Sequence, residues 1–198
     1  MIQDRPTQAL RRTVMVVAVL NLGYFVVEFA TALKIDSVAL LADSADFLED
    51  AAVNLLIFAA VGFAAVWRAR VGMGLAVLMA LPALAFLLML VQKARVPVPP
   101  EPLAMGVVGL GALVVNVTCA FLLVRHRKEA GSLTRAAFLS ARNDALANVG
   151  LILAAVVTVP FPSIWPDIVV GLAIAYMNLD AAHEVWTAAR TEVRDPVA

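Results

Sequence analysis

Six long apolar stretches dominate this sequence and restrict the chain to a membrane-spanning helical fold. A helix that crosses the hydrocarbon core needs about 20 predominantly apolar residues. The stretches that meet this length run over Thr13–Leu33, Val38–Val66, Met73–Val91, Met105–Val124, Ala136–Val159 and Ile168–Ala188. A mean hydropathy of +0.91 and a hydrophobic content of 63% are well above those of a soluble domain. The sequence therefore predicts an all-α membrane protein with six transmembrane helices.

The distribution of lysine and arginine predicts the orientation of these helices. If the N-terminus is cytoplasmic, eleven of these residues fall on the cytoplasmic side: Arg5, Arg11, Arg12, Arg68, Arg70, Arg125, Arg127, Lys128, Arg135, Arg190 and Arg194. The external loops then carry three: Lys34, Lys93 and Arg95. Because positive residues accumulate in cytoplasmic loops, both termini are predicted to be cytoplasmic. The predicted divisions are a tail over 1–12, a transmembrane domain over 13–188 and a short tail over 189–198.

Composition and local motifs exclude several other classes. The formal net charge is zero, so no basic surface indicates nucleic-acid binding. The single cysteine, Cys119, excludes a disulfide framework and a cysteine-cluster metal site within one chain, and we expect it to be a small buried hydrophobe. No small-residue cleavage site follows the first apolar run, which favours a retained helix over a signal peptide. The proline-rich run V-P-V-P-P-E-P predicts an extended loop before the fourth helix.

Polar residues with ligand atoms interrupt two of the apolar stretches. They are Asp43, Asp46 and Asp50 in the second stretch, and Ser140, Asn143 and Asp144 in the fifth. At about 100° per residue, the three aspartates of the second stretch fall within an arc of roughly 60° on one helix face.

A carboxylate at bilayer depth costs a few kcal/mol, so it is rarely present without a partner, a pathway or an ion. Two facing helices can enclose one cation if each offers two ligand side chains that are four residues apart. The alternative is that these side chains only form hydrogen bonds between helices, as Ser and Asn often do. Three aspartates on one stripe, with Asp144 opposite, favour the cation site.

Four motifs, in register over essentially the whole chain, carry a resemblance to a known family. They are R-R-T-V-M-V-V-A-V-L-N-L-G-Y-F-V-V-E-F-A-T-A-L, S-V-A-L-L-A-D-S-A-D-F-L-E-D, S-A-R-N-D-A-L-A-N-V-G and W-P-D-I-V-V-G-L-A-I-A. In these four motifs the chain resembles the cation diffusion facilitator family. The resemblance implies a divalent-cation exporter, usually exchanging metal for protons, with the metal held between the second and fifth helices. It also implies a multi-pass protein of the cell membrane, for which we expect the bacterial inner membrane.

The resemblance also implies a ligand set. The family's second-helix pair, His or Asp followed four residues later by Asp, corresponds to Asp46 and Asp50. Its fifth-helix pair, usually His and then Asp, corresponds to Ser140 and Asp144. Because Ser140 departs from the common histidine, Asn143 is an alternative carbonyl ligand, although its helical angle is less favourable. The choice between Ser140 and Asn143 stays open.

The donor atoms bear on the identity of the metal. A site of these residues is made entirely of oxygen, and oxygen ligands suit manganese better than imidazole-preferring zinc. Family resemblance favours zinc, whereas ligand type favours manganese, iron(II) or cobalt(II). No cofactor is expected beyond the transported ion.

Protons are the expected counter-ion, and the aspartates are their expected carriers. His126 and His183 both lie outside the motifs. Burial and mutual repulsion favour the protonated form of clustered carboxyl groups. Our hypothesis is therefore that metal and protons compete for Asp46, Asp50 and Asp144.

Other charged residues flank this site. Glu49 and Asp43 are interpreted as secondary or access groups beside the ligand pair. Arg142 lies two residues from both Ser140 and Asp144, so it points to the opposite side of the helix. A membrane arginine seeks a partner, and the expected structural ion pair is with Asp180 or Glu184 of the sixth helix.

Three further polar residues have no single role that the sequence predicts. Asp167 matches an acidic residue at the start of the family's sixth helix, where a capping and an entry role are equally compatible with the sequence. Glu28 and Asn21 in the first stretch receive no role.

The chain differs from the common family pattern in its loops and its ending. The fourth–fifth loop has no histidine-rich tract, and the C-terminal cytoplasmic metal-binding domain is expected to be absent. Small-residue faces such as G-V-V-G-L-G-A in the fourth helix suit close packing against another helix, either in a second copy or within the same chain. A homodimer is therefore expected by analogy alone.

Other functions were weighed against transport. An intramembrane aspartyl protease would need Y-D and G-x-G-D motifs, which do not occur, so no enzyme is expected. An organic-cation exporter would need several aromatic residues near the acids, and only Phe47 and Phe138 qualify. The remaining alternative is a non-transporting or inactive membrane scaffold of the same fold, for which Ser140 is the main support.

Overall fold

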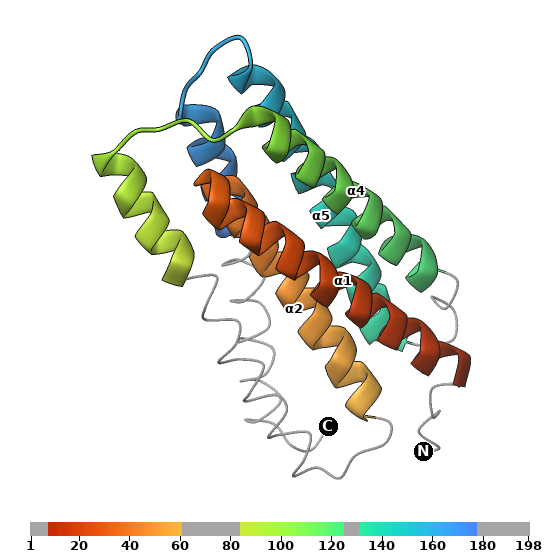
Figure 1. Ribbon diagram of the computed structural model, residues 1–198. Helices are drawn as coiled ribbons and strands as arrows, with labels where there is room; N and C mark the ends of the chain where they lie inside the picture. Colours follow the sequence, from red (N-terminus) through yellow and green to blue (C-terminus); the bar gives the residue numbers. More distant parts are fainter. Residues whose placement is uncertain (1–7, 61–83, 125–130, 178–198) are drawn as a thin grey trace.

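The computed structural model describes residues 8–60, 84–124 and 131–177 (Figure 1). Its helices are α1 (Gln8–Ile35), α2 (Val38–Ala60), a helix over 84–95, α4 (Pro102–Val124), α5 (Gly131–Thr158) and a helix over Trp165–Met177. These described ranges contain six helical segments and no strand. The prediction of an all-α, six-helix protein is therefore confirmed.

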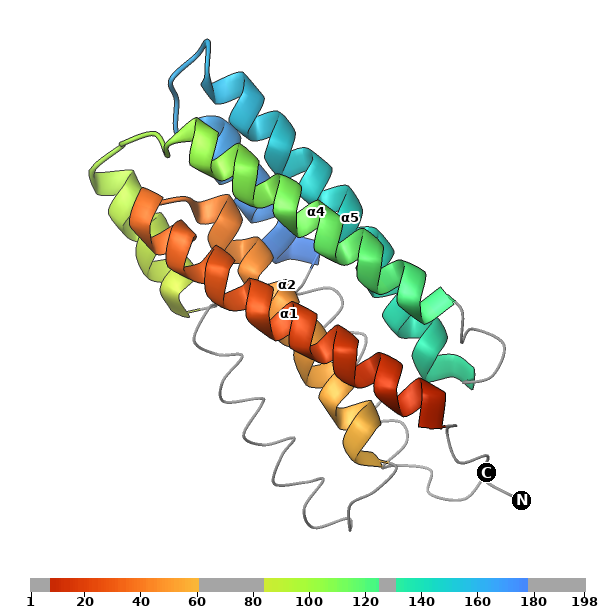
Figure 2. The same cartoon turned by 45° about the vertical axis from the view of Figure 1, so that its right-hand side comes forward.

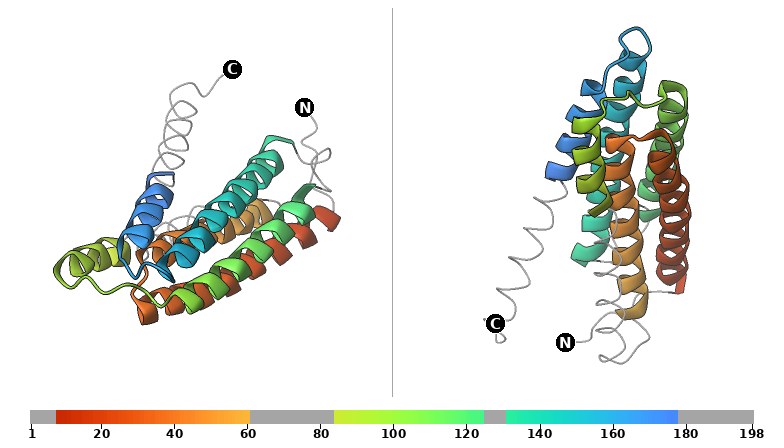
Figure 3. Two further views of the ribbon diagram at one scale, coloured as in Figure 1. Left: turned by 90° about the horizontal axis from the view of Figure 1, so that it is seen from above. Right: turned by 60° about the vertical axis from the view of Figure 1, so that its left-hand side comes forward.

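Four of the helices form the body of the bundle. α1 packs along α2, α4 packs along α5, and the two pairs meet through contacts of α1 with α4 and of α2 with α5 (Figures 1 and 2). The two remaining helices, 84–95 and Trp165–Met177, pack against the first part of α2 (Figure 3). α2 is thus enclosed on several sides, which buries the stripe that carries the aspartates.

Successive helices run in opposite directions, so the bundle has two distinct ends. α1, the helix over 84–95 and α5 finish at one end, which we call the Asp167 end because the helix containing Asp167 begins there (Figure 1). α2 and α4 finish at the opposite end, which we call the Gln8 end. The predicted topology makes the Gln8 end cytoplasmic, and this orientation stays a prediction.

The bundle is apolar outside and polar inside. Large aliphatic and aromatic side chains are exposed along the outer faces, among them Val19, Val26, Val107, Leu110, Val114, Phe121, Leu146, Leu153 and Val156. Carboxyl and amide side chains are fully or almost fully buried between the helices: Asn21, Glu28, Asp43, Asn116 and Asn148. This arrangement suits a lipid environment, where apolar side chains face hydrocarbon and polar groups must find partners within the protein.

Two of the described helices, α1 with 28 residues and α4 with 23, are long and apolar enough to span a membrane. Several helices extend beyond the predicted apolar stretches. α1 begins at Gln8 rather than Thr13, and α5 begins at Gly131 rather than Ala136. Hydropathy marks only the lipid-facing part of a helix, whereas backbone hydrogen bonding continues into the polar flanks.

The proline-rich loop is confirmed as non-helical over 96–101. α4 then begins at Pro102, where the missing N–H of proline costs nothing. The carboxylate of Glu101 accepts hydrogen bonds from the backbone N–H groups of Leu103 (2.9 Å) and Ala104 (2.6 Å). Glu101 therefore satisfies two free donors at the start of α4.

A short turn joins α1 to α2. Asp36 has a φ of 57°, and the N–H of Ser37 donates to the carbonyl of Ala32 at 3.0 Å, which closes α1 in a Schellman-type cap. Ser37 then caps α2 through a hydrogen bond from the N–H of Leu40 to its Oγ.

A buried ion pair fixes the first turn of α2 to the other helices. Asp167 accepts hydrogen bonds from Ser37 Oγ (2.7 Å), from the N–H of Val38 (3.0 Å) and from the N–H of Ala39 (3.0 Å). Lys93 donates to Asp167 Oδ2 at 2.8 Å and also donates to the carbonyl of Asp36. Neither charged side chain has any exposed surface. Asp167 thus has a capping role that connects α2, the helix over 84–95 and the helix over Trp165–Met177.

Candidate functional site

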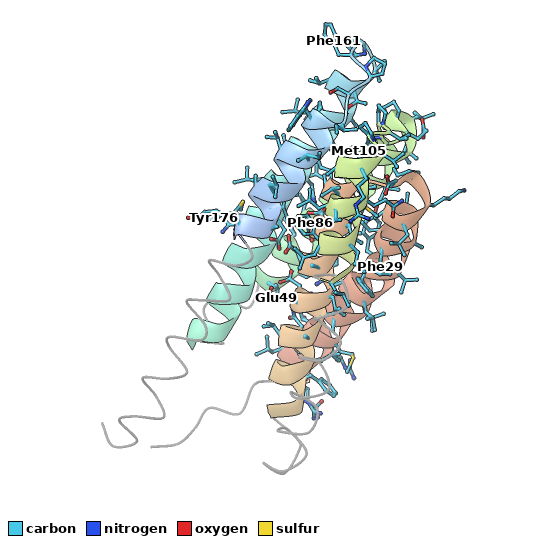
Figure 4. The ribbon with its side chains drawn as sticks, turned by 90° about the vertical axis from the view of Figure 1, so that its left-hand side faces the viewer. Phe29, Glu49, Phe86, Met105, Phe161 and Tyr176 are labelled. Atoms are coloured by element: carbon cyan, nitrogen blue, oxygen red, sulfur yellow. The ribbon has the colours of Figure 1, made fainter. Side chains whose placement is uncertain are left out.

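The acidic stripe of α2 lies inside the bundle. Asp43 is fully buried, and Asp46 and Asp50 are only 9% and 7% exposed. Glu49 is partly exposed and lies in the middle portion of the bundle (Figure 4). The three aspartates therefore share the inward face that the helical spacing predicts, and Glu49 lies at its border.

The α5 residues of the predicted site differ in their exposure. Asp144 is half-buried, whereas Asn143 is exposed. Ser140 belongs to α5, but its side chain lies outside the part that the structure describes. Of the two α5 ligand candidates whose side chains the structure describes, Asp144 is therefore more buried than Asn143.

Carboxylates from α2 and α5 converge on one region. The charge of Asp46 is repelled by that of Asp144, which comes from α5, and by those of Asp43, Glu49 and Asp50 on its own helix. Cys119 of α4 is buried near the same carboxyl groups, those of Asp50 and Asp144. The carboxyl groups of α2 and α5 thus gather around Asp46.

The described side chains do not form a closed metal centre in this conformation. No three His, Cys, Asp or Glu side chains within the described residues are grouped tightly enough to hold an ion. Acids from α2 and α5 therefore approach the same region without forming such a group of three among the described residues.

A chain of amide groups extends from the α2 stripe across the bundle. Asn148 of α5 donates to Asp43 Oδ2 at 2.6 Å, and Asn116 of α4 donates to Asn148 Oδ1 at 3.1 Å. All three side chains are buried. These two hydrogen bonds hold the side chain of Asp43 in place from α5 and α4, because each amide both donates and accepts in a fixed direction.

Two residues near the stripe were missed or left without a role in the sequence. Asn116 lies in an otherwise apolar helix, and that isolation was a usable signal for an interhelical contact. Glu28 of α1 is fully buried beside Asp43. Its position in an apolar run marked it as unusual, but its partner could not be identified without the packing of α1 on α2.

The predicted ion pair of Arg142 falls partly outside the described structure. Asp180 and Glu184 lie beyond Met177, and the side chain of Arg142 is not described either. The pairing therefore stays a prediction. His126 and His183 also lie outside the described residues.

An all-helical bundle with a lipid-facing apolar surface and buried acids on facing helices has the features of an integral membrane ion transporter. The family model for the cation efflux transmembrane domain matches residues 14–190 of the 198-residue chain. The chain therefore belongs to the cation efflux family, as the motif resemblance indicated. No curated protein matched the chain in a sequence comparison. The protein is thus a membrane-embedded cation efflux transporter, and its family is one of transporters rather than of enzymes.

Proposed function

We propose that this protein exports a divalent metal ion in exchange for protons, through a site between α2 and α5. The proposed ligands are Asp46, Asp50 and Asp144, with a fourth oxygen from Ser140 or Asn143. The observation that carries the proposal is the meeting of the buried aspartates of α2 with half-buried Asp144 of α5 around Asp46. Such a group of like charges in a low-dielectric interior is stabilised by a bound cation or by protons, and both are transported in the proposed cycle.

The described conformation suits one stage of that cycle. A transporter must release its ion as well as bind it, so the ligands cannot stay at coordination distance throughout. A small relative movement of α2 and α5, which share fewer contacts than the α1–α2 and α4–α5 pairs, would assemble or open the site. The tight packing of α1 on α2 and of α4 on α5 favours movement of these pairs as units.

The donor set favours a metal that accepts oxygen ligands. Carboxylate and carbonyl or hydroxyl oxygens suit manganese, and iron(II) and cobalt(II) also accept them, while family membership keeps zinc among the candidates. The direct test is transport by purified protein in liposomes, with each of these four ions supplied in turn. Transport of at least one ion above the level of protein-free liposomes supports the proposal. No transport of any of them, by protein with a normal helical content, would favour the inactive scaffold.

Replacing Ser140 by His is expected to shift transport toward zinc. An imidazole at this position would replace an oxygen donor by the nitrogen donor that zinc prefers. The ratio of zinc to manganese transport should then rise several-fold over that of the wild type. Ser132→His, which places histidine about two turns away on α5, is the matched control. An unchanged ratio in Ser140→His would show that Ser140 is not at the site and would turn attention to Asn143.

A further inference from the structure

Glu28 is buried in a way that ordinary packing does not explain. Its side chain has no exposed surface, and neither of its carboxyl oxygens has a hydrogen-bond partner in the described part of the chain. Asp43 Oδ1 is also buried without a partner there, although Asp43 Oδ2 accepts from Asn148. An ionised carboxylate in such surroundings carries a desolvation penalty of several kcal/mol. Something must therefore neutralise this pair of acids.

Glu28 and Asp43 lie level with each other where α1 packs on α2, because Tyr24, one turn before Glu28, packs against Phe47, one turn after Asp43, with ring centroids 5.0 Å apart. An ionised carboxylate can only accept a hydrogen bond, so two ionised groups cannot bond to each other. A bond between them requires a proton on one of the two. Close carboxyl groups share a proton for the same reason, since like charges a few ångströms apart cannot both stay ionised.

Within the described residues, the surroundings supply one donor to the pair and no cation. On α1, Tyr24 uses its hydroxyl to donate to the carbonyl of Val108. Asn21, also on α1, is buried. Asn148 of α5 donates to the far oxygen of Asp43. Within the described residues neither carboxyl group forms an ion pair with Lys, Arg or His.

Other charges reach the pair from the proposed metal site. Asp46, one turn from Asp43 on α2, adds a negative charge near Glu28. Asp144 of α5 adds a further negative charge near Asp46. A proton at Glu28 and Asp43 is therefore favoured while the site around Asp46 carries no metal.

We propose that Glu28 and Asp43 form a second site, separate from the metal ligands, which holds one proton and releases it when a divalent ion binds at Asp46. The positive charge of the ion stabilises ionised carboxylates nearby, so its arrival favours loss of the proton. The coupling is reciprocal: a proton on the pair must weaken metal binding by the same factor. Metal and proton then exclude each other without sharing a ligand. The release step rests on the proposed function, whereas the proton site itself does not.

Infrared spectroscopy of the metal-free protein in lipid nanodiscs tests the proton site. The wild type should show the C=O band of buried protonated carboxyl groups, and in Glu28→Gln this band should lose the intensity of one group per chain. Glutamine keeps the size of glutamate and can donate to Asp43 Oδ1, so the variant should fold, which thermal melting checks. Glu101→Gln, at an exposed helix cap, is the matched control and should keep the band. An unchanged band in a folded Glu28→Gln protein would overturn the proposal.

Calorimetric metal titration tests the release step. Protons released per bound ion are obtained by titrating in two buffers of different ionisation enthalpy. Glu28→Gln should still bind one ion but release one proton fewer than the wild type and Glu101→Gln. If Glu28→Gln instead loses a second bound ion, the pair is a metal site and the proposal is wrong. If the wild type binds no metal, the proposed function and the release step both fail, while the infrared result still decides the proton site.

Discussion

Asp50→Asn and Asp144→Asn, each alone, are expected to reduce metal-driven proton flux by at least about tenfold. Asparagine keeps the size and one oxygen of the aspartate but removes the negative charge that offsets a divalent ion. Even residues that only orient a metal ligand typically change metal affinity by about 10–100-fold, so loss of a ligand charge should cost at least as much. Asp50 and Asp144 come from different helices, so their equal importance would show that the ion lies between α2 and α5.

The measurement is acidification or alkalinisation of liposomes that contain a pH-sensitive dye, after addition of each candidate metal. Ser44→Ala is a matched control, because Ser44 is buried on α2 between Asp43 and Asp46 but donates only to the carbonyl of Leu41 in its own helix. This control should transport like the wild type. If the Asp50→Asn and Asp144→Asn proteins still drove metal-dependent proton flux, the assignment of the site to these residues would be untenable.

Asp167→Ala is expected to lower the free energy of unfolding by about 3–5 kcal/mol, which is the usual cost of removing one partner of a buried ion pair. The substitution leaves Lys93 charged and without its carboxylate in a fully buried position. It also removes the acceptor of the N–H groups of Val38 and Ala39 at the start of α2. Because α2 carries the acidic stripe, its first turn should loosen and transport should fall with stability.

Thermal or denaturant unfolding in detergent or nanodiscs measures this loss. The double variant Lys93→Met/Asp167→Asn removes both charges, so it should recover part of the stability that Asp167→Ala loses. Glu101→Ala, which removes a cap at the same end but on an exposed surface, should cost only about 0.5–2 kcal/mol. An Asp167→Ala protein within about 0.5 kcal/mol of the wild type, the range of ordinary surface substitutions, would contradict a role for this ion pair in holding α2.

The helices were predictable because their causes are local. Apolar stretches of spanning length, the proline-rich loop and the start of α2 at Val38 all follow from residues that are neighbours in the chain. The helix ends that differ, such as Gln8 and Gly131, lie in polar flanks where hydropathy does not report on backbone hydrogen bonds. The choice between Ser140 and Asn143 depends on the rotation of α5 against α2, which helical spacing alone cannot specify.

The class of protein, the helical framework and the stripe of Asp43, Asp46 and Asp50 could all be predicted from the order of the amino acids. Hydropathy and the period of the helix are properties of consecutive residues, so no packing information is needed to obtain them. The packing of the helices is needed to find that Glu28 lies beside Asp43 and that Asp167 caps α2, whose own capping residue, Ser37, is 130 positions away. These contacts join groups whose burial must be offset by a specific partner, and the partner is chosen by how helices pack.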